Sequence, residues 1–128
     1  MNAPRTKGTK GENEVVDLLV DAGFPRGNPE DPGDRGVKRY EGGYESHDLQ
    51  GVGPWVVEVK FRKAWHLFGW IRKIRKRASL TSAPWVIFAI HGDRRTAEGR
   101  EVGRVAVMDA DLAAALIYNW ETRQCDSP

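Results

Sequence analysis

The first regular pattern along the chain is an apolar stripe with helical spacing. It is formed by Val15, Val16, Leu18, Leu19 and Ala22. Apolar residues three and four positions apart predict an amphipathic helix that buries one side. The helix is expected to begin at residues 9–12, because Thr9 can act as N-cap while Glu12 reaches back to it in a capping box. Gly23 is expected to end it.

Strand-like segments follow a polar loop at residues 25–36. We expect three of them, around residues 37–40, 47–52 and 55–61, with turns at Gly42-Gly43 and Gly53-Pro54. Successive side chains of a strand point to opposite faces of a sheet. Glu58 and Lys60 are therefore predicted to share one face of the third strand.

The second half of the chain continues with a helix at about residues 64–78. Its apolar stripe is Leu67, Ile71, Ile74 and Ala78. The uninterrupted apolar run at 85–90 predicts a buried central strand, and 104–108 a further strand. Asp109 or Asp111 can cap a last helix that runs through Tyr118.

The order of elements is helix, three strands, helix, two strands, helix, which is typical of an α/β domain with a mixed central sheet flanked by helices. A length of 128 residues, with 40% hydrophobic and 30% charged residues, fits one domain over residues 1–128. Residues 1–8 and 121–128 are expected to be flexible tails.

The chain is also expected to be cytoplasmic. No apolar run approaches the roughly 18 residues that a membrane span requires, and the polar N-terminus does not resemble a signal peptide. The one cysteine, Cys125, excludes an intrachain disulfide and a cysteine zinc site. Any bound metal must then be held by oxygen or histidine.

Positive charge is concentrated in the middle of the chain, although the net charge is only +2. Residues 60–92 contain no acid, and their cations are Lys60, Arg62, Lys63, Arg72, Lys73, Arg75, Lys76 and Arg77. Such a block is suited to a phosphate backbone. A solvated basic helix face without a partner is the alternative.

The candidate chemistry is Asp48 followed after nine residues by Glu58-Val59-Lys60. Hydrolysis of a phosphodiester needs a divalent cation, and Mg²⁺ prefers carboxylates with retained waters. Two acids on adjacent strands can supply them. Lys60, on the same face as Glu58, can orient the attacking water or neutralise charge on the phosphate.

Glu12 is a third candidate acid, since it lies on the helix side that faces the core. It can equally serve only as half of the capping box. In the same way, Asp48 can be a simple turn residue, and Glu58 with Lys60 a weak surface ion pair.

These residues resemble the PD-(D/E)xK nuclease superfamily, and within it the archaeal-type Holliday junction resolvases and their phage relatives. The resemblance covers residues 5–90 and rests on Lys7-Gly8 before Glu12, on Asp48, and on Glu58-Val59-Lys60 closing a strand. It differs at His47, where the family usually has proline. The resemblance implies a restriction-endonuclease-like fold with Glu12, Asp48 and Glu58 as metal-linked acids and Lys60 as the catalytic lysine.

The expected function is a Mg²⁺-dependent DNA endonuclease, with Mn²⁺ able to substitute, that cuts branched DNA in recombination or repair. The resemblance implies a homodimer in a bacterial, archaeal or phage-infected cell. Expected DNA contacts are Lys7, Lys10, Arg62, Lys63, Arg72, Lys73 and Lys76, and Trp65 and Trp70 can stack on bases. A nuclease of flaps or ends, and an inactive DNA-binding module, are the alternatives.

Overall fold

The structure is a computed structural model that describes residues 3–39, 48–91 and 103–126. Its elements follow the expected order of helix, three strands, helix, two strands and helix. They are α1 (Ala3–Ala22), β1 (Lys38–Arg39), β2 (Leu49–Gln50), β3 (Val56–Arg62), α2 (Leu67–Ser79), β4 (Trp85–His91), β5 (Arg104–Met108) and α3 (Ala110–Asp126).

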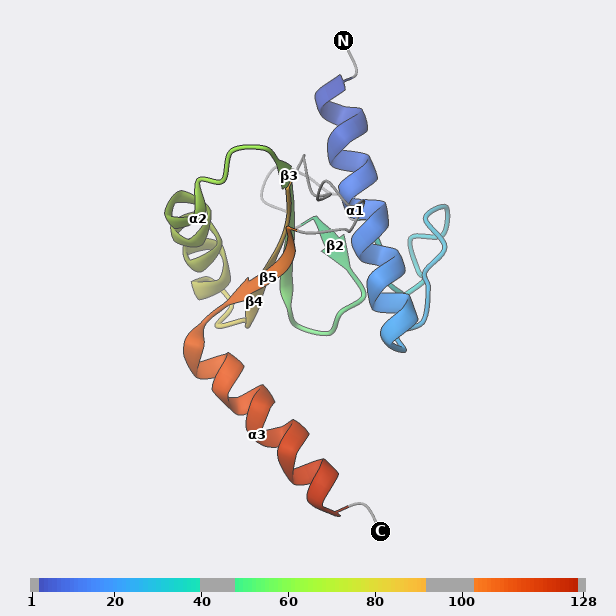
Figure 1. Cartoon of the computed structure of the whole chain (residues 1–128). Helices are drawn as coiled ribbons and strands as arrows, with labels where there is room; N and C mark the ends of the chain where they lie inside the picture. The colour runs from blue at the N-terminus through green and yellow to red at the C-terminus, as the bar shows by residue number, and fades with distance from the viewer. Residues whose placement is uncertain (1–2, 40–47, 92–102, 127–128) are drawn as a thin grey trace, which may run out of the picture.

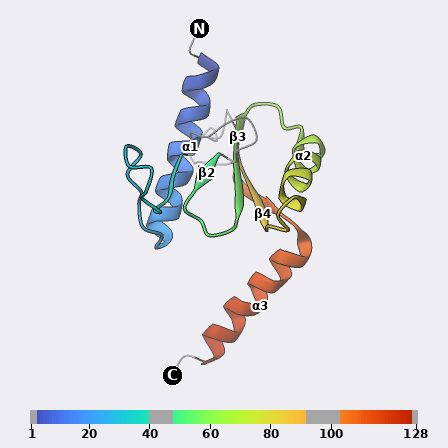
Figure 2. The same cartoon turned by 180° about the vertical axis from the view of Figure 1, so that it is seen from behind.

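The five strands form one mixed sheet in the order β1-β2-β3-β4-β5. β3 and β4 are parallel and pair from Val56 with Trp85 to Arg62 with His91, and the other neighbours are antiparallel. α1 and α2 lie on opposite faces of the sheet, as the two side views show (Figures 1 and 2). The predicted α/β class with a mixed sheet flanked by helices is confirmed.

The core beneath α1 is built from small and branched side chains. Val15 and Val16 of α1 are buried against Val57 and Val59 of β3 and Leu49 of β2. α1 and β3 approach closely, because a Cβ built on Gly11 would lie 3.1 Å from the Cβ of Phe61. The amino-terminal half of α1 therefore lies beside the carboxyl end of β3.

The core beneath α2 is more aromatic. It joins Trp70, Ile74 and Ala78 of α2 to residues of β3 and β4, among them Val56 and Trp85. Val56 and Val57 belong to opposite cores, so the alternation predicted for β3 is confirmed. Glu58 and Lys60 consequently face α2.

The predicted start of the first helix is wrong. α1 begins at Ala3, so Thr9 lies inside the helix and cannot be its N-cap. The local signal for the true start is Pro4, because the first helical turn tolerates a residue without an N–H. At the other end Gly23, with φ +128°, donates to the Val20 carbonyl, and the next residue, Phe24, donates to that of Leu19. This Schellman motif confirms Gly23 as the stop.

Two other boundaries also differ from expectation. α2 begins at Leu67 rather than residue 64, and α3 continues past Tyr118 to Asp126. Residues 3–8 and 121–126, which were expected in flexible tails, have helical backbone. The helical geometry of α3 cannot be explained by burial, because most of its side chains are exposed.

We predict that Gly51→Ala destabilises the protein far more than Gly53→Ala. Both glycines have positive φ, at +91° and +56°, but a Cβ on Gly51 would lie 2.3 Å from the Gly36 carbonyl oxygen, whereas one on Gly53 meets nothing within 4 Å. Left-handed strain alone costs about 1 kcal/mol, and the backbone clash raises the cost for Gly51 to about 3 kcal/mol or more. Urea denaturation of both variants measures the difference. Equal losses would show that the loop at Gly36 moves aside freely.

Candidate functional site

Asp48 is hydrogen-bonded to the middle of β3 through both its backbone and its side chain. Its backbone N–H donates to the Val57 carbonyl at 2.9 Å, and its Oδ2 accepts from the Val59 N–H at 2.7 Å. The carboxylate thus takes the place of a strand partner just before β2 begins. Asp48 and the segment Glu58-Val59-Lys60 are brought together in space, as their spacing predicted.

Glu58 lies almost buried beneath α2, with a side chain that is 7% exposed. Arg77 of α2 donates to its Oε1, and Lys60 Nζ lies 3.9 Å from its Oε2. Burial raises the pKa of Glu58, and Asp48 adds to the increase, while Lys60, Arg77 and Lys73 oppose it. Desolvation is the dominant effect because a charge beneath the helix loses most of its water.

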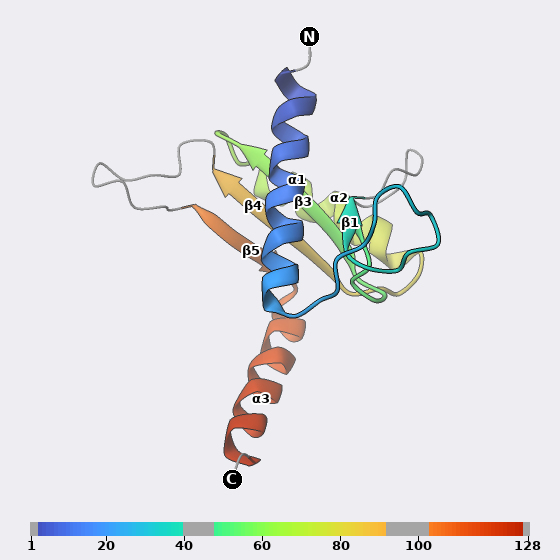
Figure 3. The same ribbon diagram turned by 90° about the vertical axis from the view of Figure 1, so that its right-hand side faces the viewer.

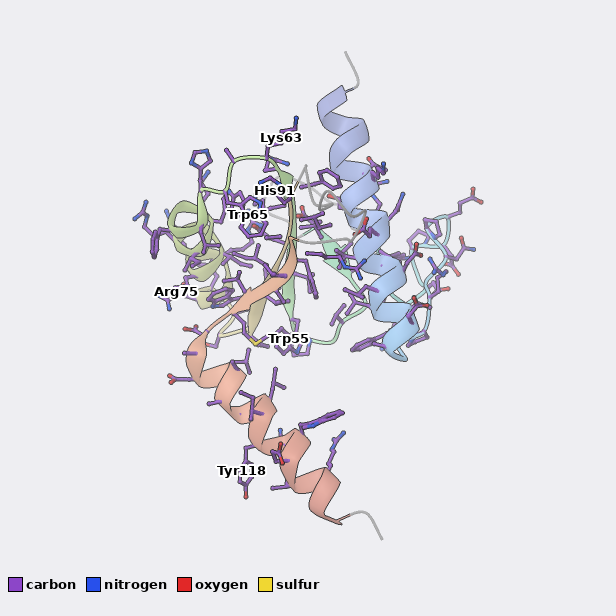
Figure 4. The ribbon with its side chains drawn as sticks, viewed as in Figure 1. Trp55, Lys63, Trp65, Arg75, His91 and Tyr118 are labelled. Carbon is purple, nitrogen blue, oxygen red and sulfur yellow. The ribbon has the colours of Figure 1, made fainter. Side chains whose placement is uncertain are left out.

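Lys60 lies at the edge of an aromatic cluster. Its Nζ is 5.9 Å from the Trp70 ring centroid, and the Trp65 ring lies 6.5 Å from Trp70 and 5.9 Å from His91. Figure 4 shows Trp65 and His91 together near the carboxyl ends of β3 and β4. Trp70 is buried in the α2 core, so it cannot stack on a base as expected. Trp65, partly exposed, keeps that possibility.

Glu12 approaches the site from the opposite face of the sheet. Its Oε1 accepts from Arg39 Nε at 2.7 Å, and its side chain is 20% exposed. Burial raises the pKa of Glu12; the hydrogen bond from Arg39 lowers it, and Asp48 raises it. Because α1 begins well before Thr9, the capping alternative for Glu12 is excluded.

The three acids do not form one cluster. Glu12 lies on the α1 side of the sheet and Glu58 on the α2 side, and Asp48 is the carboxylate whose charge acts on both. Within residues 3–39, 48–91 and 103–126, no three acid, histidine or cysteine side chains are placed to hold one metal ion. The three-acid metal set expected from the sequence is therefore not assembled in this geometry.

Two carboxylates can be enough for a hard cation. Mg²⁺ is commonly bound through one or two carboxylates and retains several waters. Asp48 Oδ2 accepts from Val59, and Oδ1 accepts no hydrogen bond within the described residues. Both oxygens of Glu58, in contrast, have cationic partners within the protein, Arg77 at Oε1 and Lys60 at Oε2.

The predicted DNA contacts lie in two places. Lys10, Arg62 and Lys63 are exposed near the end where α1 meets the carboxyl end of β3, and Figure 4 labels Lys63 there. Arg72, Lys73 and Lys76 are exposed on α2. A hollow beside the last turns of α2 is lined by Lys73, Lys76, Arg77 and Leu80. Lys7 lies in α1.

Two arginines of the basic block, whose own segment contains no acid, are paired with acids from outside that segment. Arg75 donates to Asp109 at 2.9 Å, and Arg77 pairs with Glu58. Both acids are distant in sequence, so the charge pattern of the block alone gave no sign of them. The sequence also gave no sign that Arg39 is the partner of Glu12, because the two residues lie 27 positions apart.

His91 was also given no role from the sequence. The parallel register pairs it with Arg62, which carries it to the end of the sheet where Lys60 lies. The available signal was its position directly after the apolar run. His47, the neighbour of Asp48, lies outside the described residues.

The chain matches no protein-family model, no curated protein and no solved structure. The resemblance to the PD-(D/E)xK nucleases stays a prediction. No helix within the described residues is long and apolar enough to cross a membrane.

The raised pKa of Glu58 generates a prediction for stability. A carboxyl group whose pKa is higher in the folded than in the unfolded chain stabilises the fold below the ordinary pKa of 4.5, and that contribution is lost as pH rises through the raised value. The unfolding free energy of the wild type, relative to Glu58→Gln, should therefore fall over this window. Urea unfolding from pH 4 to 8 in EDTA measures it, with Glu30→Gln as the surface control. If the unfolding free energy of the wild type, relative to Glu58→Gln, rose with pH, the pKa of Glu58 would be lowered by folding and not raised.

Proposed function

We propose that the protein is a metal-dependent endodeoxyribonuclease that hydrolyses phosphodiester bonds in branched DNA such as Holliday junctions. The observation that supports this most directly is the hydrogen bond from the Val59 N–H to Asp48 Oδ2, at 2.7 Å. It anchors one acid to the centre of the segment that carries the other acid and the lysine. A chance occurrence of these residue types would not require them to meet.

Each residue has a distinct part in this proposal. Asp48, through Oδ1, and Glu58 would hold Mg²⁺ or Mn²⁺. The bound cation would supply Lewis-acid stabilisation of the phosphoryl oxygen and lower the pKa of water. Lys60, 3.9 Å from Glu58, would neutralise charge that develops on the phosphate. Glu12, oriented by Arg39, would increase the negative potential around Asp48.

DNA would be held by the exposed cations on both sides of this acid pair. Acids repel a polyanion unless a cation lies between them, so carboxylates among basic residues favour a metal-assisted reaction over binding alone. We propose that the enzyme acts in recombination or repair in the cytoplasm, as a homodimer on junctions. Flaps and DNA ends are the alternative substrates.

One observation favours a second candidate function. Glu58 already has two cationic partners, Arg77 and Lys60, and Glu12 has Arg39. A site whose acids are satisfied by the protein itself is also suited to a DNA-binding module that does not cleave. The two functions differ in whether added Mg²⁺ changes the DNA or only its binding.

We predict that Asp48→Asn abolishes Mg²⁺-dependent cleavage while DNA binding is unchanged or stronger, because the substitution removes a negative charge next to phosphate. Labelled junction, flap, single-stranded and linear DNAs are incubated with Mg²⁺, with Mn²⁺ and with EDTA. Asp21→Asn, an exposed position on α1, is the matched control and should cut like the wild type. Wild-type protein that binds DNA but cuts no substrate would support the non-catalytic module. An Asp48→Asn protein with full activity would exclude the site.

We predict that Lys73→Ala with Lys76→Ala weakens DNA binding at all sequences alike. Each lost phosphate contact lowers the logarithmic salt slope by roughly 0.9, so the slope should flatten by up to about two units. Fluorescence anisotropy on junction DNA across a salt series measures this. The control removes equal charge from Arg26 and Arg35, exposed in the loop beside α1 (Figure 1). Equal effects of the two pairs would mean that only total charge matters.

A further inference from the structure

Arg77 lies at the boundary between the outer surface of α2 and the buried Glu58. Its guanidinium donates to Glu58 Oε1, and its side chain is 30% exposed, whereas that of Glu58 is 7% exposed. The other cation near this carboxylate is Lys60, whose Nζ lies 3.9 Å from Oε2, beyond hydrogen-bond distance. Arg77 is therefore the residue that joins the acid beneath α2 to the surface of the helix.

Arg77 also lines the hollow beside the last turns of α2. The other residues that line it are Lys73, Lys76 and Leu80. In Figure 3, α1 crosses in front of the sheet and α2 lies behind it, so the hollow is on the side of the sheet away from α1. Lys73 and Arg77 are four positions apart, a spacing at which like charges on a helix repel each other. Three cations around one hollow therefore favour an anion there.

The anion that suits this hollow is a phosphate of the DNA backbone. The planar fork of an arginine binds a phosphate with the same two-donor geometry that it uses for a carboxylate. A phosphate next to Arg77 therefore competes with Glu58 for one guanidinium. Basic residues in the last turn of a helix also stabilise its dipole, but that effect needs neither a hollow nor a contact with a buried acid.

The proposed function requires Glu58 to bind a divalent cation, and the present inference rests on that requirement. In the structure, Oε1 accepts from Arg77, so a cation and Arg77 compete for the same oxygen. Arg77 cannot simply move away, because a buried carboxylate that loses its ionic partner is strongly destabilising. Its departure becomes favourable when a phosphate takes the guanidinium while a cation takes the carboxylate.

We propose that Arg77 is a positioning residue that couples DNA binding to metal binding. A backbone phosphate in the hollow takes the guanidinium from Glu58 Oε1 and leaves that oxygen to the cation. DNA and the cation then bind cooperatively, because the pair of Arg77 with Glu58 is broken once for both. Linkage makes the effect reciprocal, so the cation strengthens DNA binding by the factor by which DNA strengthens cation binding.

Cation binding without DNA tests the competition directly. The affinity of the full chain for Mn²⁺ is measured by isothermal titration calorimetry. Arg77→Gln should bind Mn²⁺ on the order of tenfold more tightly than the wild type, because the competitor for Oε1 is gone. The matched control is Lys73→Gln, which removes from the same helix another charge that acts on Glu58, and its effect should be much smaller. Equal effects of the two variants would mean that only local charge matters and would overturn the proposal.

The coupling itself is the dissociation constant for junction DNA in EDTA divided by that in Mn²⁺. Fluorescence anisotropy measures both constants, on DNA that a gel shows to be uncut. The ratio should be on the order of ten for the wild type and well below that for Arg77→Gln. Arg75→Gln, which removes the same charge from an arginine paired with Asp109, should keep the wild-type ratio. A wild-type ratio near one, or an unchanged ratio in Arg77→Gln, would overturn the coupling.

Glu58→Gln separates this inference from the proposed function. If that variant lost Mn²⁺ binding while Arg77→Gln behaved like the wild type, only the coupling would be wrong. If Glu58→Gln bound Mn²⁺ as tightly as the wild type, the metal site of the proposed function would be wrong, and the coupling with it.

Circular dichroism and a thermal melt establish that each variant is folded. Because Arg77→Gln leaves Glu58 without its hydrogen-bonded cation, a second measurement uses the wild type alone. Nuclear magnetic resonance follows the side-chain N–H signal of Arg77, which is assigned by its absence from Arg77→Lys. The signal should shift when junction DNA and Mg²⁺ are added together. A signal that keeps its position in the saturated complex would show that Arg77 stays on Glu58 and would overturn the proposal.

Discussion

Burial of β3 on both faces is the constraint on which the rest of the structure depends. α1 covers Val57 and Val59, α2 covers Val56, and β4 pairs along the whole strand. A charged residue in such a strand loses most of its water and needs partners from its own face. Glu58 finds them in Arg77 and Lys60. The same burial raises the pKa of Glu58.

The sheet itself separates the acids. Glu12 and Glu58 lie on opposite sides, each held by an arginine from another element. Asp48 lies just before the start of β2, where its charge acts on both. The charge of Asp48 therefore raises the pKa of both glutamates. The Val59 N–H donates to the Asp48 carboxylate and so ties that position to the backbone of β3, the strand that carries Glu58.

Opposite charges distinguish the surfaces of α2 and α3. The exposed face of α2 carries cations, whereas α3 carries three acids and one arginine. Asp109, the residue just before α3, connects the two regions, because its carboxylate accepts from Arg75 of α2 and from Trp85 of β4. One carboxylate thus neutralises part of the basic face and also sets the direction in which α3 leaves the sheet.

The sequence by itself determined the order of elements, the mixed α/β class, the alternation in β3 and the stop at Gly23, because these follow from local periodicity and backbone preference. It also indicated that Asp48 and Glu58-Val59-Lys60 belong together. Only the tertiary structure decided the partners of the charges. Arg39, Arg77 and Asp109 meet their counterions across long separations, and the sheet places Glu12 and Glu58 on different faces. Ion pairs of this kind depend on which faces pack together, and no local pattern encodes that.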